Sequence, residues 1–165
     1  MDLDKLNTNG KLSKELTDFI LNIPIFGNLD SEELHYVADQ MKFIEINSGE
    51  ILFNEWDRSE FVCFVVYGSL DVMKKSGPDS YAILSTLKRG KSIGEMALID
   101  NSPRSATVKA NTKSILALLP KDHFATILEN RPHIGIKLLK GIARLLSHNL
   151  RKTSTRLADY MLPLS

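Results

Sequence analysis

The sequence predicts a mainly β fold with flanking helices, in the form of an antiparallel barrel, sandwich or jelly roll. The chain has 165 residues, of which 43% are hydrophobic and 25% charged, a composition typical of one globular domain. Between residues 42 and 120, short apolar runs with a period of two are separated by clusters of Gly, Pro, Asn, Asp and Ser, which indicates strands joined by turns. On both sides of this region the apolar residues have helical spacing.

The expected strands are short and follow one another as in an all-β domain. They cover residues 43–46, 50–53, 61–66, 70–73, 81–87, 106–110 and 115–119. We therefore expect a β region over residues 42–120.

We expect residues 1–10 to be flexible and residues 12–41 to hold two helices. Pro24 should end the first helix near Asn22, because proline disfavours helical backbone in the residue before it. The apolar residues of this helix are Leu12, Leu16, Phe19 and Ile20.

The second helix has a clear start signal. Asp30 and Glu33 have the spacing of a capping box, and Leu29 and Leu34 have that of the accompanying hydrophobic staple. The buried face then continues through Val37, Ala38 and Met41.

Helices return over residues 121–162. A short one begins near Asp122, and Pro132, favourable in a first turn, opens a second of roughly 30 residues and about 45 Å that runs toward Leu162. Along it, steps of four and three residues form a heptad seam. We expect either a partner helix or a fold-back onto the domain to cover this seam, which consists of Leu139, Ala143, Leu146, Leu150, Thr153, Leu157 and Tyr160.

Several features predict a cytoplasmic protein. No apolar run approaches the length of a membrane span, and the N-terminus has no basic segment followed by an apolar one, as a secretory signal would. Cys63 is the only cysteine, which excludes a disulfide within the chain.

Charge is unevenly distributed along the chain. Residues 1–60 hold 13 acidic and 5 basic side chains, whereas residues 61–165 hold 7 and 16. The basic part would attract an anion, although solvated lysines on strand edges and helix faces explain the same count.

The segment most suggestive of chemistry is 94–106. Gly94 lets a ligand approach the backbone closely, and one helical turn over residues 95–98 would offer free amides to an anion. Arg104 follows Pro103, and a guanidinium pairs with two phosphate oxygens at once. Glu95 can accept a hydrogen bond from a sugar hydroxyl, so the pair suits a ligand with both a phosphate and a ribose. A surface turn with a Glu–Arg ion pair is the alternative.

This segment resembles the phosphate-binding cassette of the cyclic-nucleotide-binding domain family, which includes bacterial catabolite activators, regulatory subunits of cAMP-dependent kinases and nucleotide-gated channels. The family pattern is Phe-Gly-Glu-(apolar)-Ala-Leu, then Pro-Arg-x-Ala-(Ser or Thr)-Val. Here it reads Ile-Gly-Glu-Met-Ala-Leu over residues 93–98 and Pro-Arg-Ser-Ala-Thr-Val over residues 103–108. The resemblance extends from Ile23 to the terminal helix, and implies a β-roll, or double-stranded jelly roll, as one domain over residues 11–165.

The resemblance also implies site roles. Arg104 would pair with the cyclic phosphate, and Glu95 would bind the ribose 2′-hydroxyl. Main-chain amides would complete the phosphate site at Gly94, Ala97, Ser105 and Ala106. Val72 and Leu84 would line the base and sugar, and Asn149 would lie near the purine edge.

The chain departs from the family pattern in three places. Ile93 replaces Phe, Trp56 replaces the Gly of a Glu-Gly-Asp turn, and Cys63 replaces a strand Tyr. None of these changes removes a phosphate ligand. Ser105 does not settle the base, but we expect cAMP rather than cGMP because bacterial activators that bind cAMP resemble this sequence at Ser105.

Other chemistries have less support. Gly90-Lys91-Ser92 imitates the end of a P-loop but lacks its first glycine, Ser85 standing there. The four histidines have no metal-ligand spacing, and Cys63 has no histidine signature beside it. We therefore expect a non-enzymatic sensor with no cofactor other than its ligand, cAMP or cGMP.

The expected partners follow from the same observations. The terminal helix would pair in a homodimer or present itself to an effector protein. The chain ends too soon after this helix for a helix-turn-helix, so no DNA-binding domain is expected. A scaffold that has lost nucleotide binding and a small jelly-roll enzyme are the alternatives.

Overall fold

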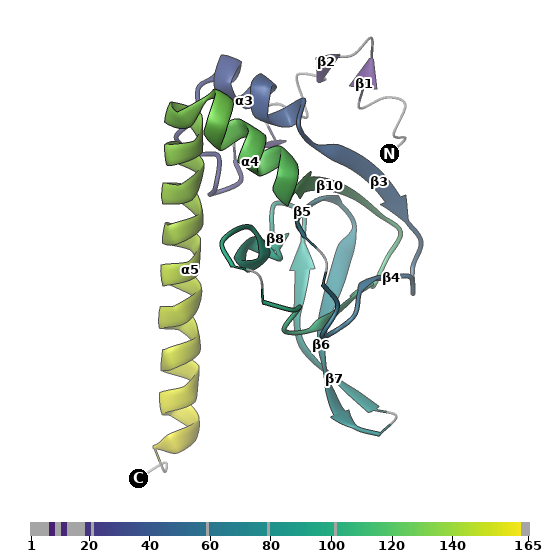
Figure 1. Ribbon diagram of the computed structural model, residues 1–165. Helices are drawn as coiled ribbons and strands as arrows, with labels where there is room; N and C mark the ends of the chain where they lie inside the picture. Colours follow the sequence, from purple (N-terminus) through teal and green to yellow (C-terminus); the bar gives the residue numbers. More distant parts are fainter. Residues whose placement is uncertain are drawn as a thin grey trace.

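The domain is a β-roll of two four-stranded antiparallel sheets flanked by helices (Figure 1). The computed structural model describes residues 7–8, 11–12, 19–20, 22–58, 60–78, 80–100 and 102–162. One sheet has the order β3-β10-β5-β8 and the other β4-β9-β6-β7. The strands are β3 Lys42–Ile46, β4 Ile51–Phe53, β5 Phe61–Tyr67, β6 Ser69–Gly77, β7 Ser80–Lys88, β8 Ser92–Ile93, β9 Thr107–Ala110 and β10 Ser114–Pro120.

The predicted fold class is confirmed in this form. Each expected strand lies within one or two residues of an observed one, except that β6 and β7 form a longer hairpin. The two sheets are separate layers rather than one closed barrel in the described part of the chain. The sequence did not reveal β8, whose two residues are too few for a period-two pattern.

Two apolar clusters form the core. One lies among the strands and includes Cys63, Val65 and Leu116. The other joins the helices to the first sheet and includes Phe26 and Phe64, whose ring centroids are 4.9 Å apart. The helical segments are therefore part of the domain core.

Helix α3, Ser31–Ala38, begins at the predicted capping box. The amide of Glu33 donates to Asp30 Oδ1 at 2.9 Å, and the amide of Asp30 donates to Glu33 Oε2 at 3.0 Å. Both staple residues, Leu29 and Leu34, are buried in the same apolar cluster.

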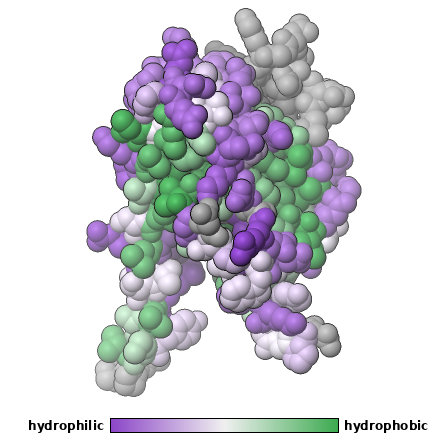
Figure 2. All heavy atoms as spheres, in the orientation of Figure 1, coloured by the Kyte–Doolittle hydropathy of each residue, from purple (hydrophilic) through white to green (hydrophobic). Residues whose placement is uncertain are grey.

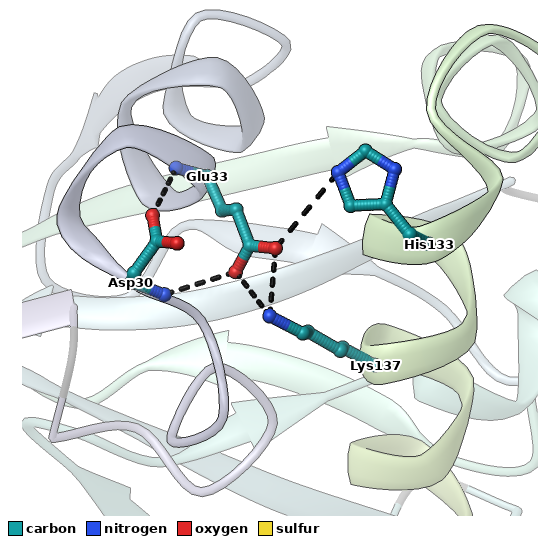
Figure 3. A network of polar contacts seen from close by, with 4 residues as sticks. All are labelled: Asp30, Glu33, His133 and Lys137. Carbon is teal, nitrogen blue, oxygen red and sulfur yellow. Dashed lines mark hydrogen bonds and ion pairs between the residues drawn. The ribbon is translucent and has the colours of Figure 1, made fainter.

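The carboxylate of Glu33 also joins α3 to the long terminal helix (Figure 3). Lys137 Nζ donates to both Glu33 oxygens at 2.7 Å, and His133 Nε2 lies 3.9 Å from Glu33 Oε1. The hydrogen bond from Lys137, together with that from the Asp30 amide, lowers the pKa of Glu33. This cluster fixes the first turns of the terminal helix against α3.

The expected C-terminal helices are α4, Lys121–Asn130, and α5, Pro132–Met161. The first half of α5 is packed on the domain, with Ile134, Leu138 and Ile142 buried. The second half extends away from the β-roll (Figure 1), and its seam leucines, Leu150 and Leu157, are 68% and 58% exposed. In the described part of the chain this end of the seam is therefore uncovered, whereas Leu146 nearer its start is partly buried against the core cluster that includes Phe26 and Phe64.

The N-terminal segment differs from its prediction. Two-residue strands β1, Asn7–Thr8, and β2, Lys11–Leu12, pair antiparallel, so Leu12 does not start a helix and residues 7–8 are part of a hairpin. Most of the helix expected before Asn22 lies outside the described residues, although Phe19 and Ile20 are helical.

No helix in the described part of the chain is both long and apolar enough to cross a bilayer.

Gly141 provides a test of how α5 is seated. A Cβ at Gly141 would lie 2.3 Å from the Ile25 carbonyl oxygen, which is backbone and cannot yield easily. We expect Gly141→Ala to lower the free energy of unfolding by about 1–3 kcal/mol through overpacking, although alanine favours helices elsewhere. Urea denaturation measures this, with exposed Ser147→Ala on the same helix as the control. Equal or greater stability of Gly141→Ala would contradict the seating of α5.

Candidate functional site

The two halves of the 94–106 segment face one pocket. β8 leads through Gly94 into a single 3-10 turn, η1, Glu95–Leu98, and the chain returns through Pro103 to β9. The pocket lies between the turn and the returning strand. Its lining is Phe53, Ile93, Gly94, Glu95, Met96, Ala97, Asp100, Ser102, Pro103, Arg104, Ser105 and Ala106.

Arg104 is buried at the base of this segment, with 5% of its surface exposed. Its Nη2 donates to the Phe61 carbonyl at 2.7 Å, and its Nη1 donates to the Gly94 carbonyl at 3.3 Å. The guanidinium carbon lies 4.1 Å from the ring centroid of Phe53 and 4.7 Å from that of Phe61. The carbonyls and ring faces hold the cation in one orientation.

Burial lowers the pKa of Arg104, and the charges around it, including those of Glu95 and Asp57, oppose this effect. An arginine stays protonated despite such a shift. The pocket therefore holds a permanent positive charge that is largely removed from solvent, where its attraction for an anion is stronger than in water.

Position 94 requires glycine for two reasons, its backbone conformation and the lack of room for a side chain. Its φ is +87°, in the left-handed region that glycine adopts freely. A Cβ there would lie 2.1 Å from Arg104 Nη1 and 3.0 Å from the Phe61 carbonyl oxygen. Glycine therefore allows Arg104 to reach beneath η1.

Glu95 is also buried, with 7% of its surface exposed. Its Oε1 accepts from Asn149 Nδ2 at 3.5 Å, whereas Oε2 is buried with no hydrogen-bond partner among the described residues. Burial raises the pKa of Glu95, although its own backbone amide and Arg104 act in the other direction. An unsatisfied buried carboxylate oxygen is costly, and a ligand hydroxyl could satisfy it.

The residues predicted to donate to the phosphate all line the pocket, but the amide of Ala97 is already used within η1. The Ala97 amide already donates to the Gly94 carbonyl at 3.1 Å within η1, which differs from its expected role as a free donor. This bond is what closes the turn. Ser105 and Ala106 line the pocket beside Arg104, in the segment just before β9.

Val72 and Leu84 do not line this pocket. Val72 is buried in the cluster among the strands, and Leu84 is 54% exposed on β7. The pairing of β6 with β7 shifts between Val72 and Met73, opposite Ser85 and Ile83. Leu84 thus lies in a bulge, which redirects side chains and cannot be read from period-two spacing.

Asn149, on α5, reaches the carboxylate of Glu95 at the pocket. Its Nδ2 donates to Glu95 Oε1 at 3.5 Å, and the contact with a purine edge that the resemblance implies stays a prediction. The bond connects the exposed half of α5 directly to the pocket.

Three contacts of the site were not anticipated from the sequence. Phe53 and Phe61 flank Arg104, and the Phe61 carbonyl accepts from it. In the sequence, Phe53 and Phe61 are typical apolar strand residues. A main-chain carbonyl that accepts a hydrogen bond leaves no sequence motif. Cys63 is buried in the cluster among the strands, and this burial raises the pKa of its thiol.

A β-roll with a buried arginine and glutamate in one helix–loop pocket defines a small-molecule-binding module. The chain belongs to the cyclic nucleotide-binding domain family, whose model matches residues 43–131.

Similar proteins support this assignment. A cAMP-dependent protein kinase regulatory subunit from Yarrowia lipolytica is 34% identical over 110 residues, which are 67% of this chain and 28% of that protein. Lysophospholipase nte1 from Neurospora crassa is 30% identical over 110 residues, 67% of this chain and 7% of that protein. The chain thus spans less than a third of the length of either relative.

Among solved structures, a cyclic nucleotide-binding domain from Methylobacillus flagellatus KT is similar, with a TM-score of 0.81 and 27% identity. The similarity covers 91% of this chain and 86% of that one. The likeness therefore includes the flanking helices as well as the β-roll.

Glu95 provides a pH-dependent test of the pocket. A raised folded-state pKa favours folding at pH values below the unfolded pKa, and this advantage is lost as the pH rises through the folded pKa. Burial therefore penalises the ionised form of Glu95 in the ligand-free protein. We expect Glu95→Gln to raise the free energy of unfolding at pH 7 by roughly 1 kcal/mol or more, and this gain to shrink as the pH falls from the raised folded-state pKa toward the unfolded-state value of about 4. Denaturation at several pH values measures it, with exposed Glu32→Gln as the control; a gain that does not depend on pH would contradict the assignment.

Proposed function

We propose that this chain is a non-enzymatic sensor module that binds a 3′,5′-cyclic nucleotide, cAMP in preference to cGMP, and repositions α5 on binding. The observation that carries this proposal is the pocket itself. The guanidinium of Arg104 and the unsatisfied oxygen of Glu95 are buried in the lining of one cavity, on either side of Gly94. A cyclic phosphate joined to a ribose hydroxyl matches that pair of groups.

Each group has a distinct role. Arg104 neutralises the phosphate, and the amides of Ser105 and Ala106, two residues that line the same pocket, donate to its oxygens. Glu95 accepts a hydrogen bond from the ribose 2′-hydroxyl through Oε2. The family and the named cAMP dependence of the kinase relatives support this ligand class.

The sensing step is a population shift. Asn149 holds Glu95 Oε1 in the present structure, and a ribose hydroxyl on Oε2 would bind the other oxygen of the same carboxylate. Ligand and the second half of α5 would therefore share one side chain, and this shared side chain is the proposed link between binding and the position of α5. For the shift to occur, the ligand must bind one α5 position better than the other.

Arg104 tests the phosphate site. We expect Arg104→Ala to weaken cAMP binding by about 2–5 kcal/mol, because it removes the partner of a partly desolvated phosphate charge. Arg104→Lys should not restore full affinity, since an ammonium cannot donate in the same planar geometry. Isothermal titration calorimetry measures both.

The control is Arg89→Ala, which removes an exposed arginine outside the pocket. Unchanged affinity in Arg104→Ala would contradict the site assignment. If the wild-type protein gives no heat and no thermal shift with cAMP or cGMP, the fold acts as a nucleotide-independent scaffold instead.

The exposed half of α5 supports a second part of the proposal, a homodimer. The seam residues Leu150, Leu157 and Tyr160 are 68%, 58% and 90% exposed, and apolar side chains recur along α5 to its end (Figure 2). A second copy of the same helix would cover the seam in a coiled coil, because the heptad spacing repeats on both helices. An effector helix with the same pattern is the other possible occupant.

We expect Leu150→Asp to convert the dimer to a monomer, because a coiled-coil core position does not accept a charge without a partner. Sedimentation equilibrium measures the change. Thr155→Asp places the same charge off the seam and is the control. A wild-type monomer at high protein concentration would contradict the homodimer.

A further inference from the structure

Three residues from separate parts of the chain meet behind the pocket. Lys74 Nζ, on β6, lies 2.8 Å from Glu55 Oε1 and donates to the Ser105 carbonyl at 2.9 Å. The Glu55 side chain is 12% exposed and that of Lys74 49%. One ammonium thus joins the segment just before β9, at Ser105, to the turn after β4.

That turn also holds the backbone of Arg104. The Trp56 amide donates to the Arg104 carbonyl at 2.9 Å, and the Arg104 amide donates to the Asp57 carbonyl at 2.9 Å. The Glu55 amide donates to Thr107 Oγ1 at 2.9 Å. These bonds continue the pairing of β4 with β9 beyond Phe53, as far as the arginine.

The turn needs support of its own. Trp56 has a φ of +73°, in the left-handed region that bulky residues rarely adopt. The Asn54 amide donates to Asp57 Oδ2 at 2.7 Å, which closes the turn from one side. The Lys74–Glu55 ion pair holds it from the other.

We propose that Lys74 and Glu55 are positioning residues for the phosphate site. They join the 54–57 turn to the Ser105 carbonyl and so fix the backbone of Arg104 and Ser105. This backbone position lets the guanidinium donate to the Gly94 and Phe61 carbonyls. This inference rests on the proposed nucleotide-binding function. Neither residue needs to touch the ligand for this role.

An alternative is that Lys74 acts only as a nearby positive charge that attracts the phosphate. The two roles predict opposite effects of changing its partner. If Lys74 attracts the phosphate directly, Glu55→Gln removes a competing negative charge and should strengthen binding. If the pair positions the backbone, Glu55→Gln loosens the turn and should weaken binding.

The test compares cAMP affinities by calorimetry in four variants. We expect Lys74→Ala and Glu55→Gln each to weaken binding roughly tenfold, the size of one charge-assisted hydrogen bond. Lys74→Arg should recover most of the affinity because it can still bridge both acceptors. Lys75→Ala, an exposed lysine on the same strand, should bind as the wild type does.

A second measurement reports the backbone directly. In both weakened variants, hydrogen exchange at the Arg104 amide should be faster, since its bond to the Asp57 carbonyl lies in the loosened turn, while exchange in the buried strand β10 stays unchanged. This comparison separates a local effect from general loss of folding.

The outcomes distinguish the inference from the function it rests on. Wild-type affinity in Lys74→Ala, or tighter binding by Glu55→Gln, overturns the positioning role while the Arg104 site stands. Absence of cAMP binding in the wild type overturns both.

Discussion

The site depends on one buried cation. Arg104 lies under the η1 turn with its guanidinium between two carbonyl acceptors and two aromatic rings. A buried charge is tolerated only where polar groups replace its hydration, and here strand β5, the Gly94 turn and β4 each supply some of them. The geometry leaves no room for a side chain at position 94. Gly94 and Arg104 of the motif are therefore in direct contact in the structure, and a side chain at position 94 would displace the guanidinium.

Glu95 is the second buried charged residue of the pocket, and unlike Arg104 it is incompletely hydrogen-bonded. It is buried near Arg104, and one of its oxygens has no hydrogen-bond partner in the described part of the chain. Such a group lowers the stability of the ligand-free protein. In the proposed function a ligand hydroxyl removes that cost, so the same unsatisfied atom that weakens the empty pocket favours the occupied one.

Helix α5 divides into a structural half and an exposed half. Lys137 and Gly141 attach the first half to α3 and to the backbone at Ile25. Asn149 lies where the exposed half begins to leave the domain and contacts Glu95. A single helix thus links the core, the pocket and a surface open to a partner.

The sequence predicts the local features well because they depend on neighbouring residues. The capping box at Asp30, the extent of the terminal helix and the cassette residues around Gly94 and Arg104 are all encoded within a few positions. Features that depend on contacts between elements could not be predicted in this way. Examples are the extra residue at Leu84 in the pairing of β6 with β7 and the hydrogen bond that Asn149 of α5 makes to Glu95.

The most direct test of the central claim is a titration of isotope-labelled protein with cAMP, followed by nuclear magnetic resonance of backbone amides and arginine side chains. We expect saturable shifts of the Arg104 guanidinium and of the Ser105 and Ala106 amides, with the resonance of Gly68, which joins β5 to β6 and does not line the pocket, unmoved. Saturable binding that leaves the Arg104 guanidinium unshifted would show that the phosphate is bound elsewhere.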